Sequence, residues 1–170
     1  YMVKSILEEK GLKVGIIGTI EAKIGSTKLM TSSNTTPDAI GLQRLFAKMY
    51  DENVDAVVME VSSHALELNR VYGIKFIVGV FTNLSEDHLD FHETMEDYLN
   101  AKAKLFQMSD FAIVNGDDIY APRLLKMIET KKATYGLDNA VDLTATDVRI
   151  NPSYVEFKMY VNKMLETIKI

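Results

Sequence analysis

The sequence predicts an α/β fold with three layers, in which helices flank a mostly parallel sheet. Helical periodicity alternates with short apolar runs along residues 1–140, and runs such as FIVGVF at 76–81 are apolar at every position. Strands of that kind are typical of parallel sheets covered by helices on both faces. After about residue 141 the pattern changes to a period of two, which predicts antiparallel hairpins on the edge of the main sheet.

The first element expected is a helix within residues 1–10. Met2, Val3, Ile6 and Leu7 form its apolar stripe, and Gly11 supplies a C-terminal stop. Further elements of an α/β core over residues 1–140 are then predicted in the following order: a strand at 13–19, a helix at 37–51, strands at 56–61 and 76–82, a helix at 95–108, a strand at 111–115, a helix at 120–129 and a strand at 133–135. The β-hairpin appendage, residues 141–170, is expected to contain strands at 143–150, 154–160 and 164–170.

The segment between the first strand and the second helix, residues 20–36, is predicted to be a long loop rich in hydroxyl and amide groups. Thr36 followed by Pro37 favours a helix N-cap at Thr36. The same amides and hydroxyls at a helix N-terminus also suit a phosphate or carboxylate ligand. Thr94, with Asp97 three residues later, predicts a second cap.

Composition excludes several classes of function. The chain has 170 residues, a formal net charge of −5, and no cysteine. Cysteine nucleophiles, disulfides and iron–sulfur clusters are therefore excluded, and a cytoplasmic protein is expected. The acidic balance, without a basic stripe, argues against nucleic acid as a partner, and no apolar run is long enough to cross a membrane. The length predicts a single domain.

Both ends of the chain suggest a fragment. A helix that leads into a buried strand is the second half of a βαβ unit, so a strand and a loop are expected before Tyr1. The last predicted strand reaches Ile170 without a stop signal. We therefore expect a domain that is truncated at both ends.

Polar groups gather where the strand at 56–61 ends. Glu60 is followed by Ser62, Ser63 and His64. Ligands of open α/β sheets bind at the carboxyl ends of the strands. A glutamate in an apolar strand is costly without charge compensation, so a bound cation explains it, with a strand-end salt bridge as the alternative.

The next strand ends similarly. Six ionisable side chains fall within residues 86–93, and they include His88. A solvated helix entry would explain this run by itself. Carboxylates with one imidazole, beside Glu60, suit Mg²⁺ or Mn²⁺ better than zinc.

A lysine lies on the apolar face of the helix at 95–108. Lys102 shares its face with Tyr98 and Leu105 at helical spacing. Such lysines usually extend their ammonium group to solvent. A desolvated lysine instead has a lowered pKa and can react as a nucleophile with substrate or carbon dioxide. The chain contains neither G-x-x-x-x-G-K-[ST] nor G-x-G-x-x-G.

These motifs together resemble a known family, the Mur ligases, through their central domain, and most closely the MurE type. The resemblance runs from residue 1 to about residue 149. It is carried by the following strings: NTTP at 34–37, MEVSSHAL at 59–66, Arg70, FTNLSEDHLDFH at 81–92, Tyr98, AKAKLF at 101–106 and NGDD at 115–118.

The resemblance implies an ATP-dependent acid–amino-acid ligase of peptidoglycan precursor synthesis. Such an enzyme activates the carboxylate of UDP-MurNAc-L-Ala-D-Glu as an acyl phosphate and adds L-lysine or meso-diaminopimelate. Its substrates are small molecules, namely the UDP-muramyl-peptide, ATP and the amino acid, and Mg²⁺ is the cofactor.

The resemblance also implies residue roles. Glu60 and His88 would bind magnesium, and Lys102 would become a carbamate that supplies a further oxygen ligand, so these three are the expected catalytic residues. The remaining matches fall into two groups: the positions that hold the UDP-sugar substrate are Thr35, Thr36, Ser62 and Arg70, and the position near adenine is Asn115. A fixed cation and metal ions suit a reaction that brings two anions together.

Two alternatives remain open. The family's phosphate loop is expected before Tyr1 and its amino-acid-selecting domain after Ile170, so the isolated chain is expected to have no ligase turnover. It would then act as a non-catalytic module that binds the UDP-sugar peptide. Another ligase of the Mur or folylpolyglutamate type is the second alternative, although NTTP and EVSSHAL favour MurE. The sequence does not decide between lysine and diaminopimelate, nor does it give the oligomeric state.

Overall fold

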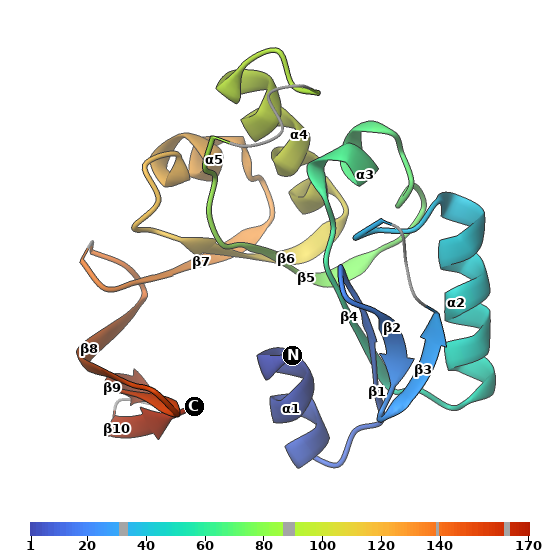
Figure 1. Ribbon diagram of the computed structural model, residues 1–170. Coiled ribbons are helices and arrows are strands. Elements are labelled where there is room, and N and C mark those ends of the chain that lie inside the picture. The colour runs from blue at the N-terminus through green and yellow to red at the C-terminus, as the bar shows by residue number, and fades with distance from the viewer. Residues whose placement is uncertain (31–33, 87–90, 139, 162–163) are drawn as a thin grey trace. The chain divides into compact units, whose positions relative to one another are not determined.

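The computed structural model describes residues 1–30, 34–86, 91–138, 140–161 and 164–170, and the chain divides into two compact units. Unit 1 spans Tyr1–Ile74 and unit 2 spans Lys75–Ile170. Figure 1 labels the elements of each unit. Within the described ranges, no helix combines the length and apolar character needed to span a membrane.

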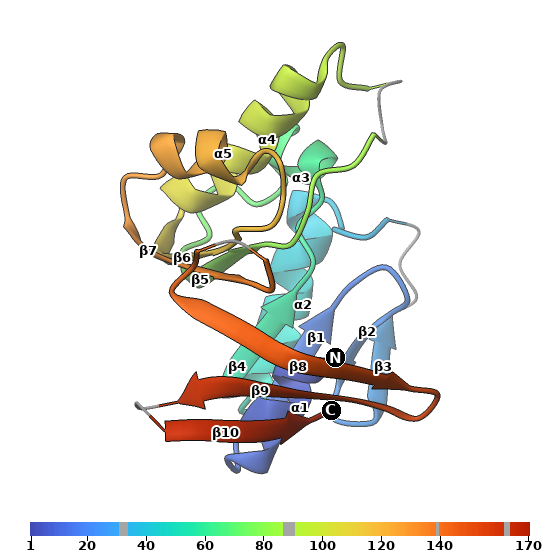
Figure 2. The same cartoon turned by 90° about the vertical axis from the view of Figure 1, so that its left-hand side faces the viewer.

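Unit 1 is a small mixed sheet with helices on two sides. Its elements are α1 (Met2–Glu9), β1 (Val14–Ile17), β2 (Ala22–Ile24), β3 (Thr27–Met30), α2 (Ala39–Asp51), β4 (Ala56–Met59) and α3 (Ser63–Glu67). The strand order is β3-β2-β1-β4, with β1 and β4 parallel and the other neighbours antiparallel. Helices α1 and α2 lie on opposite sides of this sheet in Figures 1 and 2. The α/β prediction is confirmed for this unit.

Helix α1 ends at the glycine that the sequence indicated. Gly11 has φ +82, and the N–H groups of Gly11 and Leu12 donate to the carbonyls of Glu8 and Leu7. This is the Schellman arrangement, which a residue with a Cβ adopts only at a cost.

The burial of α1 differs from the prediction. Met2, Val3 and Ile6 are exposed within the chain, whereas Lys4 is buried. Lys4 donates to the carboxylate of Glu8 one turn later, at 2.6 Å, so its ammonium charge is paired. A paired lysine can bury its aliphatic stem.

The segment predicted as a long loop contains a hairpin. Strands β2 and β3 pair antiparallel across Gly25 and Ser26, and Gly25 has φ +55. The prediction was wrong here because three- and four-residue strands with alternating lysines give a weak apolar pattern. Residues 31–33 of the same loop lie outside the described ranges.

The N-cap of α2 is Asp38, not Thr36. The Asp38 carboxylate accepts a bond from the N–H of Gly41 at 2.8 Å. Both residue types are good caps. Thr36 does not cap the helix, because its hydroxyl is hydrogen-bonded to the main chain of Glu60 and Ser62, just after β4.

Unit 2 is a six-stranded sheet that changes from parallel to antiparallel. Its elements are β5 (Phe76–Phe81), α4 (Met95–Gln107), β6 (Ser109–Asn115), α5 (Ala121–Met127), β7 (Lys131–Gly136), β8 (Leu143–Asn151), β9 (Tyr154–Val161) and β10 (Met164–Lys169). The order is β10-β9-β8-β7-β6-β5, with parallel pairs from β5 to β8 and antiparallel pairs beyond. The antiparallel C-terminal strands were correctly predicted, within one residue at each end.

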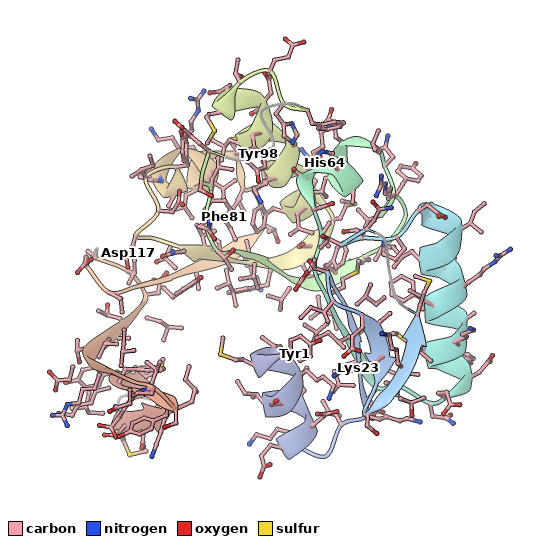
Figure 3. All side chains as sticks on the ribbon, viewed as in Figure 1. Tyr1, Lys23, His64, Phe81, Tyr98 and Asp117 are labelled. Carbon is pink, nitrogen blue, oxygen red and sulfur yellow. The ribbon has the colours of Figure 1, made fainter. Side chains whose placement is uncertain are left out.

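The core of unit 2 lies between its parallel strands and helices α4 and α5, on the face seen uppermost in Figure 1. Phe81 and Tyr98, labelled in Figure 3, belong to it together with Leu99 and Leu124. Thr94 caps α4 as predicted, by accepting from the N–H of Asp97. Strand β5 is less covered than its apolar sequence suggests, because Ile77 is 80% exposed at the edge of the sheet.

The connection from β7 to β8 is closed by one carboxylate. Asp142 accepts from the main-chain N–H of Thr134 at 2.8 Å and from its hydroxyl at 2.9 Å. These bonds, the main-chain one first, lower the pKa of Asp142 from its ordinary value. Because the pKa is lower in the folded state than in the unfolded state, the stabilisation is complete above the unfolded pKa and is lost as pH falls through the folded one.

We therefore expect Asp142→Asn to cost less than about 1 kcal/mol of unfolding free energy at pH 7, because solvent screens this exposed group. The difference from wild type should shrink as the pH falls below about 4. Urea unfolding of both chains at several pH values measures it. Asp51→Asn, at the exposed end of α2, is the control, and a cost for Asp142→Asn that does not vary with pH would contradict the assignment.

Candidate active site

Glu60 lies at the carboxyl ends of the parallel strands β1 and β4. Ile17 pairs with Met59, and the N–H of Glu60 donates to the carbonyl of Ile17 at 2.9 Å. The exposed carboxylate of Glu60 then turns across the end of β1. It makes no ion pair with any described residue, so the salt-bridge alternative is not what compensates its charge there.

Two features of the chain after β1 hold this carboxylate. Thr19 donates to Glu60 Oε2 twice, from its main-chain N–H at 2.8 Å and from its hydroxyl at 2.6 Å. Gly18 provides the space, since a Cβ there would lie 3.0–3.1 Å from the Glu60 carboxylate atoms. Neither residue was predicted to belong to the site, although both follow directly on the buried strand β1.

Thr35 extends this arrangement by one hydroxyl. Its Oγ1 lies 3.1 Å from Oγ1 of Thr19. A hydroxyl carries one proton and a carboxylate can only accept, so Thr19 donates to Glu60 and Thr35 donates to Thr19. Thr35 is half-buried, and its lone pairs remain able to accept.

Thr36 is fully buried and joins the loop to the end of β4. Its hydroxyl donates to the carbonyl of Glu60 and accepts from the N–H of Ser62, both at 3.0 Å. The side chain of Thr36 therefore positions the turn that carries Glu60. Its predicted contact with substrate stays a prediction.

Ser62 and Arg70 flank the short helix α3. The hydroxyl of Ser62 accepts from the N–H of Ala65 at 3.2 Å, which makes Ser62 the N-cap. Arg70 is half-buried and donates from Nη1 to the carbonyl of Thr36 at 3.0 Å. A guanidinium has five donors, and among the described residues only this one bond engages them, so most of the Arg70 fork is available for an anion.

Lys102 lies half-buried on α4 in unit 2. Its Nζ is 5.0 Å from the centre of the Tyr98 ring. The Tyr98 ring is in turn stacked on the ring of His92, with 4.7 Å between the ring centroids. Burial lowers the pKa of Lys102 from its ordinary value, and the negative charge of Asp118 opposes that shift. The amine is thus shifted towards its neutral, nucleophilic form.

Asn115 lies at the end of β6 and is engaged by the chain itself. Its Nδ2 donates to the carbonyl of Thr82 at 2.9 Å, and its Oδ1 accepts from the N–H of Asp117 at 3.1 Å. The side chain therefore fixes the turn that follows β6. One amide N–H is not used in these bonds and could meet a ligand.

The two aspartates after Asn115 tie neighbouring segments of unit 2 together. Asp118 accepts from the N–H groups of Leu84 and Tyr120, both at 2.8 Å. Asp117, labelled in Figure 3, accepts from two N–H groups of the loop after β7. A Cβ at Gly136 would lie 2.7 Å from Asp117 Oδ1, so this approach needs glycine. The NGDD string signalled this turn, but its bonding pattern depends on the sheet.

His88 falls at 87–90, outside the described ranges, so its predicted metal role is not tested. Among the residues that are described, no group of three or more His, Asp or Glu side chains could hold a metal ion. Glu60 belongs to unit 1, whereas Lys102 and Asn115 belong to unit 2.

Comparison with known proteins places these residues in a family. The model of the Mur ligase middle domain matches residues 1–170. The chain is 48% identical, over all of its length, to UDP-N-acetylmuramoyl-L-alanyl-D-glutamate--2,6-diaminopimelate ligase 1 of Clostridium acetobutylicum, of which it covers 35%. It is 50% identical over 157 residues to the corresponding ligase of Clostridium tetani, which is 92% of the chain and 32% of that relative.

Solved structures of Mur ligases have the same fold as this chain. A structure of a UDP-N-acetylmuramoyl-L-alanyl-D-glutamate--2,6-diaminopimelate ligase matches 98% of the chain and 35% of its own length, with a TM-score of 0.87 and 27% identity. The MurF ligase of Thermotoga maritima, solved in complex with ADP, shares the fold with a TM-score of 0.65 and 18% identity, over 99% of the chain and 36% of its own. The chain thus spans about a third of the length of the curated relatives it matches. It belongs to the family of Mur ligase middle domains.

Proposed function

We propose that the full-length gene product is an ATP-dependent ligase that joins meso-diaminopimelate to UDP-N-acetylmuramoyl-L-alanyl-D-glutamate. The observation that carries the proposal is the 48% identity with a ligase of that name over all 170 residues. Relatives from Clostridium tetani and Clostridium botulinum, 50% and 46% identical to the chain, are also named as ligases of this substrate and 2,6-diaminopimelate. Diaminopimelate is therefore preferred to lysine, the other amino acid that the motifs allowed. The lack of cysteine is consistent with a cytoplasmic enzyme.

The chemistry begins with two anions. A substrate carboxylate oxygen attacks the γ-phosphorus of ATP, the bond to the bridging oxygen breaks, and ADP leaves with an acyl phosphate remaining. The neutral amine of the amino acid then attacks the acyl carbon. Phosphate departs with the bonding pair, and an amide is formed after loss of a proton.

The donor groups suit magnesium. Glu60 presents an exposed carboxylate whose Oε1 accepts from no described residue, and hard oxygen ligands are those that Mg²⁺ prefers. Lys102, with its lowered pKa, is disposed to form a carbamate, which would add a further oxygen ligand. We propose Glu60, His88 and the Lys102 carbamate as ligands. Bound Mg²⁺ would neutralise charge on the phosphate and carboxylate oxygens.

The remaining residues are proposed to bind substrate. The free part of the Arg70 fork would hold an anionic group, and the lone pairs of Thr35 would accept from a substrate donor. Thr36 and Ser62, which are bonded to the turn after β4, would present that turn to the UDP-sugar peptide. Asn115 would approach adenine with its remaining amide N–H.

The experiment is phosphate release by the full-length gene product with ATP, Mg²⁺ and UDP-MurNAc-L-Ala-D-Glu, with meso-diaminopimelate and L-lysine supplied separately. We expect release that depends on diaminopimelate, with product confirmed by mass spectrometry. Release with lysine alone would correct the choice of amino acid. No release with either would overturn the ligase, and calorimetry with the UDP-sugar peptide would then test the binding module.

A further inference from the structure

The hydrogen bonds that Thr19 donates to the Glu60 carboxylate reach only one of its two oxygens. Both donors from Thr19, its main-chain N–H and its hydroxyl, converge on Oε2. No other described residue donates to the carboxylate. Oε2 thus accepts two hydrogen bonds from Thr19, whereas Oε1 accepts none from the residues that the structure describes.

We propose that Thr19 is a positioning residue that orients the Glu60 carboxylate for a divalent cation, with Oε1 as the ligand atom. This inference rests on the proposed function, in which Glu60 binds magnesium. An exposed glutamate side chain has several rotatable bonds, and ordering it opposes binding. Hydrogen bonds to a ligating carboxylate fix its plane before the ion arrives.

Two neighbours support the same orientation. A Cβ at Gly18 would lie 3.0–3.1 Å from the carboxylate atoms of Glu60. Its absence lets the carboxylate lie against the end of β1. The hydroxyl of Thr35 donates to Thr19, which polarises the Thr19 hydroxyl and strengthens its bond to Glu60. Two consecutive hydrogen bonds, from Thr35 to Thr19 and from Thr19 to Glu60, therefore end on Oε2.

The test is Mn²⁺ binding by the full-length gene product without nucleotide, followed by electron paramagnetic resonance of the free ion. Thr19→Val removes the hydroxyl with little change in shape and keeps the main-chain donor. We expect it to weaken Mn²⁺ binding about 10- to 100-fold, which is the usual effect of losing such a partner of a metal ligand. Thr19→Ser keeps the hydroxyl and should stay within about threefold of wild type.

Two further variants serve as a second test and as a control. Gly18→Ala should weaken binding in the same direction, because its methyl group would displace the carboxylate. Thr27→Val, at an exposed position of β3 in the same unit, is the matched control and should bind as wild type does. Circular dichroism melting confirms that each variant is folded.

The outcomes separate this inference from the proposed function. Wild-type binding by Thr19→Val, equal losses in Thr19→Val and Thr19→Ser, or no Mn²⁺ binding by wild type would each overturn the role of Thr19. The ligation assay is scored independently. A wild-type protein that binds Mn²⁺ through Thr19 but ligates neither amino acid would overturn only the proposed reaction.

Discussion

Replacing Lys102 by alanine in the full-length gene product is expected to slow ligation by about 10³-fold or more. Removing an oxygen ligand of a catalytic metal is expected to cost several kcal/mol of transition-state stabilisation. About 1.4 kcal/mol corresponds to a factor of ten in rate. Lys102 is suited to this role because its half-buried amine, beside Tyr98, has a lowered pKa. In the proposed carbamate formation, its neutral form would attack carbon dioxide, so that a C–N bond forms and one proton is released.

The carbamate itself can be observed. We expect ¹³C-bicarbonate to give a carbamate carbon resonance in the wild type that is missing from Lys102→Ala, and we expect carbon dioxide-free buffer to reduce wild-type ligation. Lys126→Ala, on an exposed face of α5 in the same unit, should retain both signals. Full ligation by Lys102→Ala would remove this lysine from the proposed machinery.

Thr36→Val is expected to lower the free energy of unfolding by about 2–4 kcal/mol, since two partly buried main-chain groups lose their partner at a cost of about 1–3 kcal/mol each. Valine has nearly the same shape, so no cavity is added. The groups are the carbonyl of Glu60 and the N–H of Ser62. Urea unfolding of wild type and variant gives the difference.

Thr36→Ser keeps the hydroxyl and should recover most of the loss. Thr27→Val makes the same chemical change at an exposed position of β3 and should cost less than about 0.5 kcal/mol. Should Thr36→Val prove as stable as wild type, the bridge between the loop and β4 would carry no net stabilisation.

The parallel strands β1, β4 and β5 and their carboxyl-end residues were predictable because each of these strands is a continuous apolar run. Glu60 was found in this way, and its place at the sheet edge follows from the pairing of β1 with β4. The short elements were not predictable. β2, β3 and the five-residue α3 contain too few residues for a periodic pattern, and the sheet stabilises them through long-range pairing.

The partners of the site residues were also beyond the sequence. Thr36 and Asp38 have equal capping chemistry, and only the position of β4 decides which one caps α2. Thr19 is 41 residues from Glu60, so nothing local indicates their bond. Lys102 was recognised as a half-buried lysine from helical spacing alone, because a helix face is fixed by a short stretch of sequence.

The turn after β6 also has a consequence for chemical ageing. Asn115-Gly116 is the dipeptide most prone to deamidation, in which the glycine nitrogen attacks the asparagine side-chain carbonyl. Here the N–H of Gly116 is bonded to the carbonyl of Tyr135 at 2.8 Å, and both ends of the Asn115 amide are held by Thr82 and Asp117. The native sheet therefore protects this bond from cyclisation, and unfolding of unit 2 would expose it to irreversible conversion into aspartate and isoaspartate.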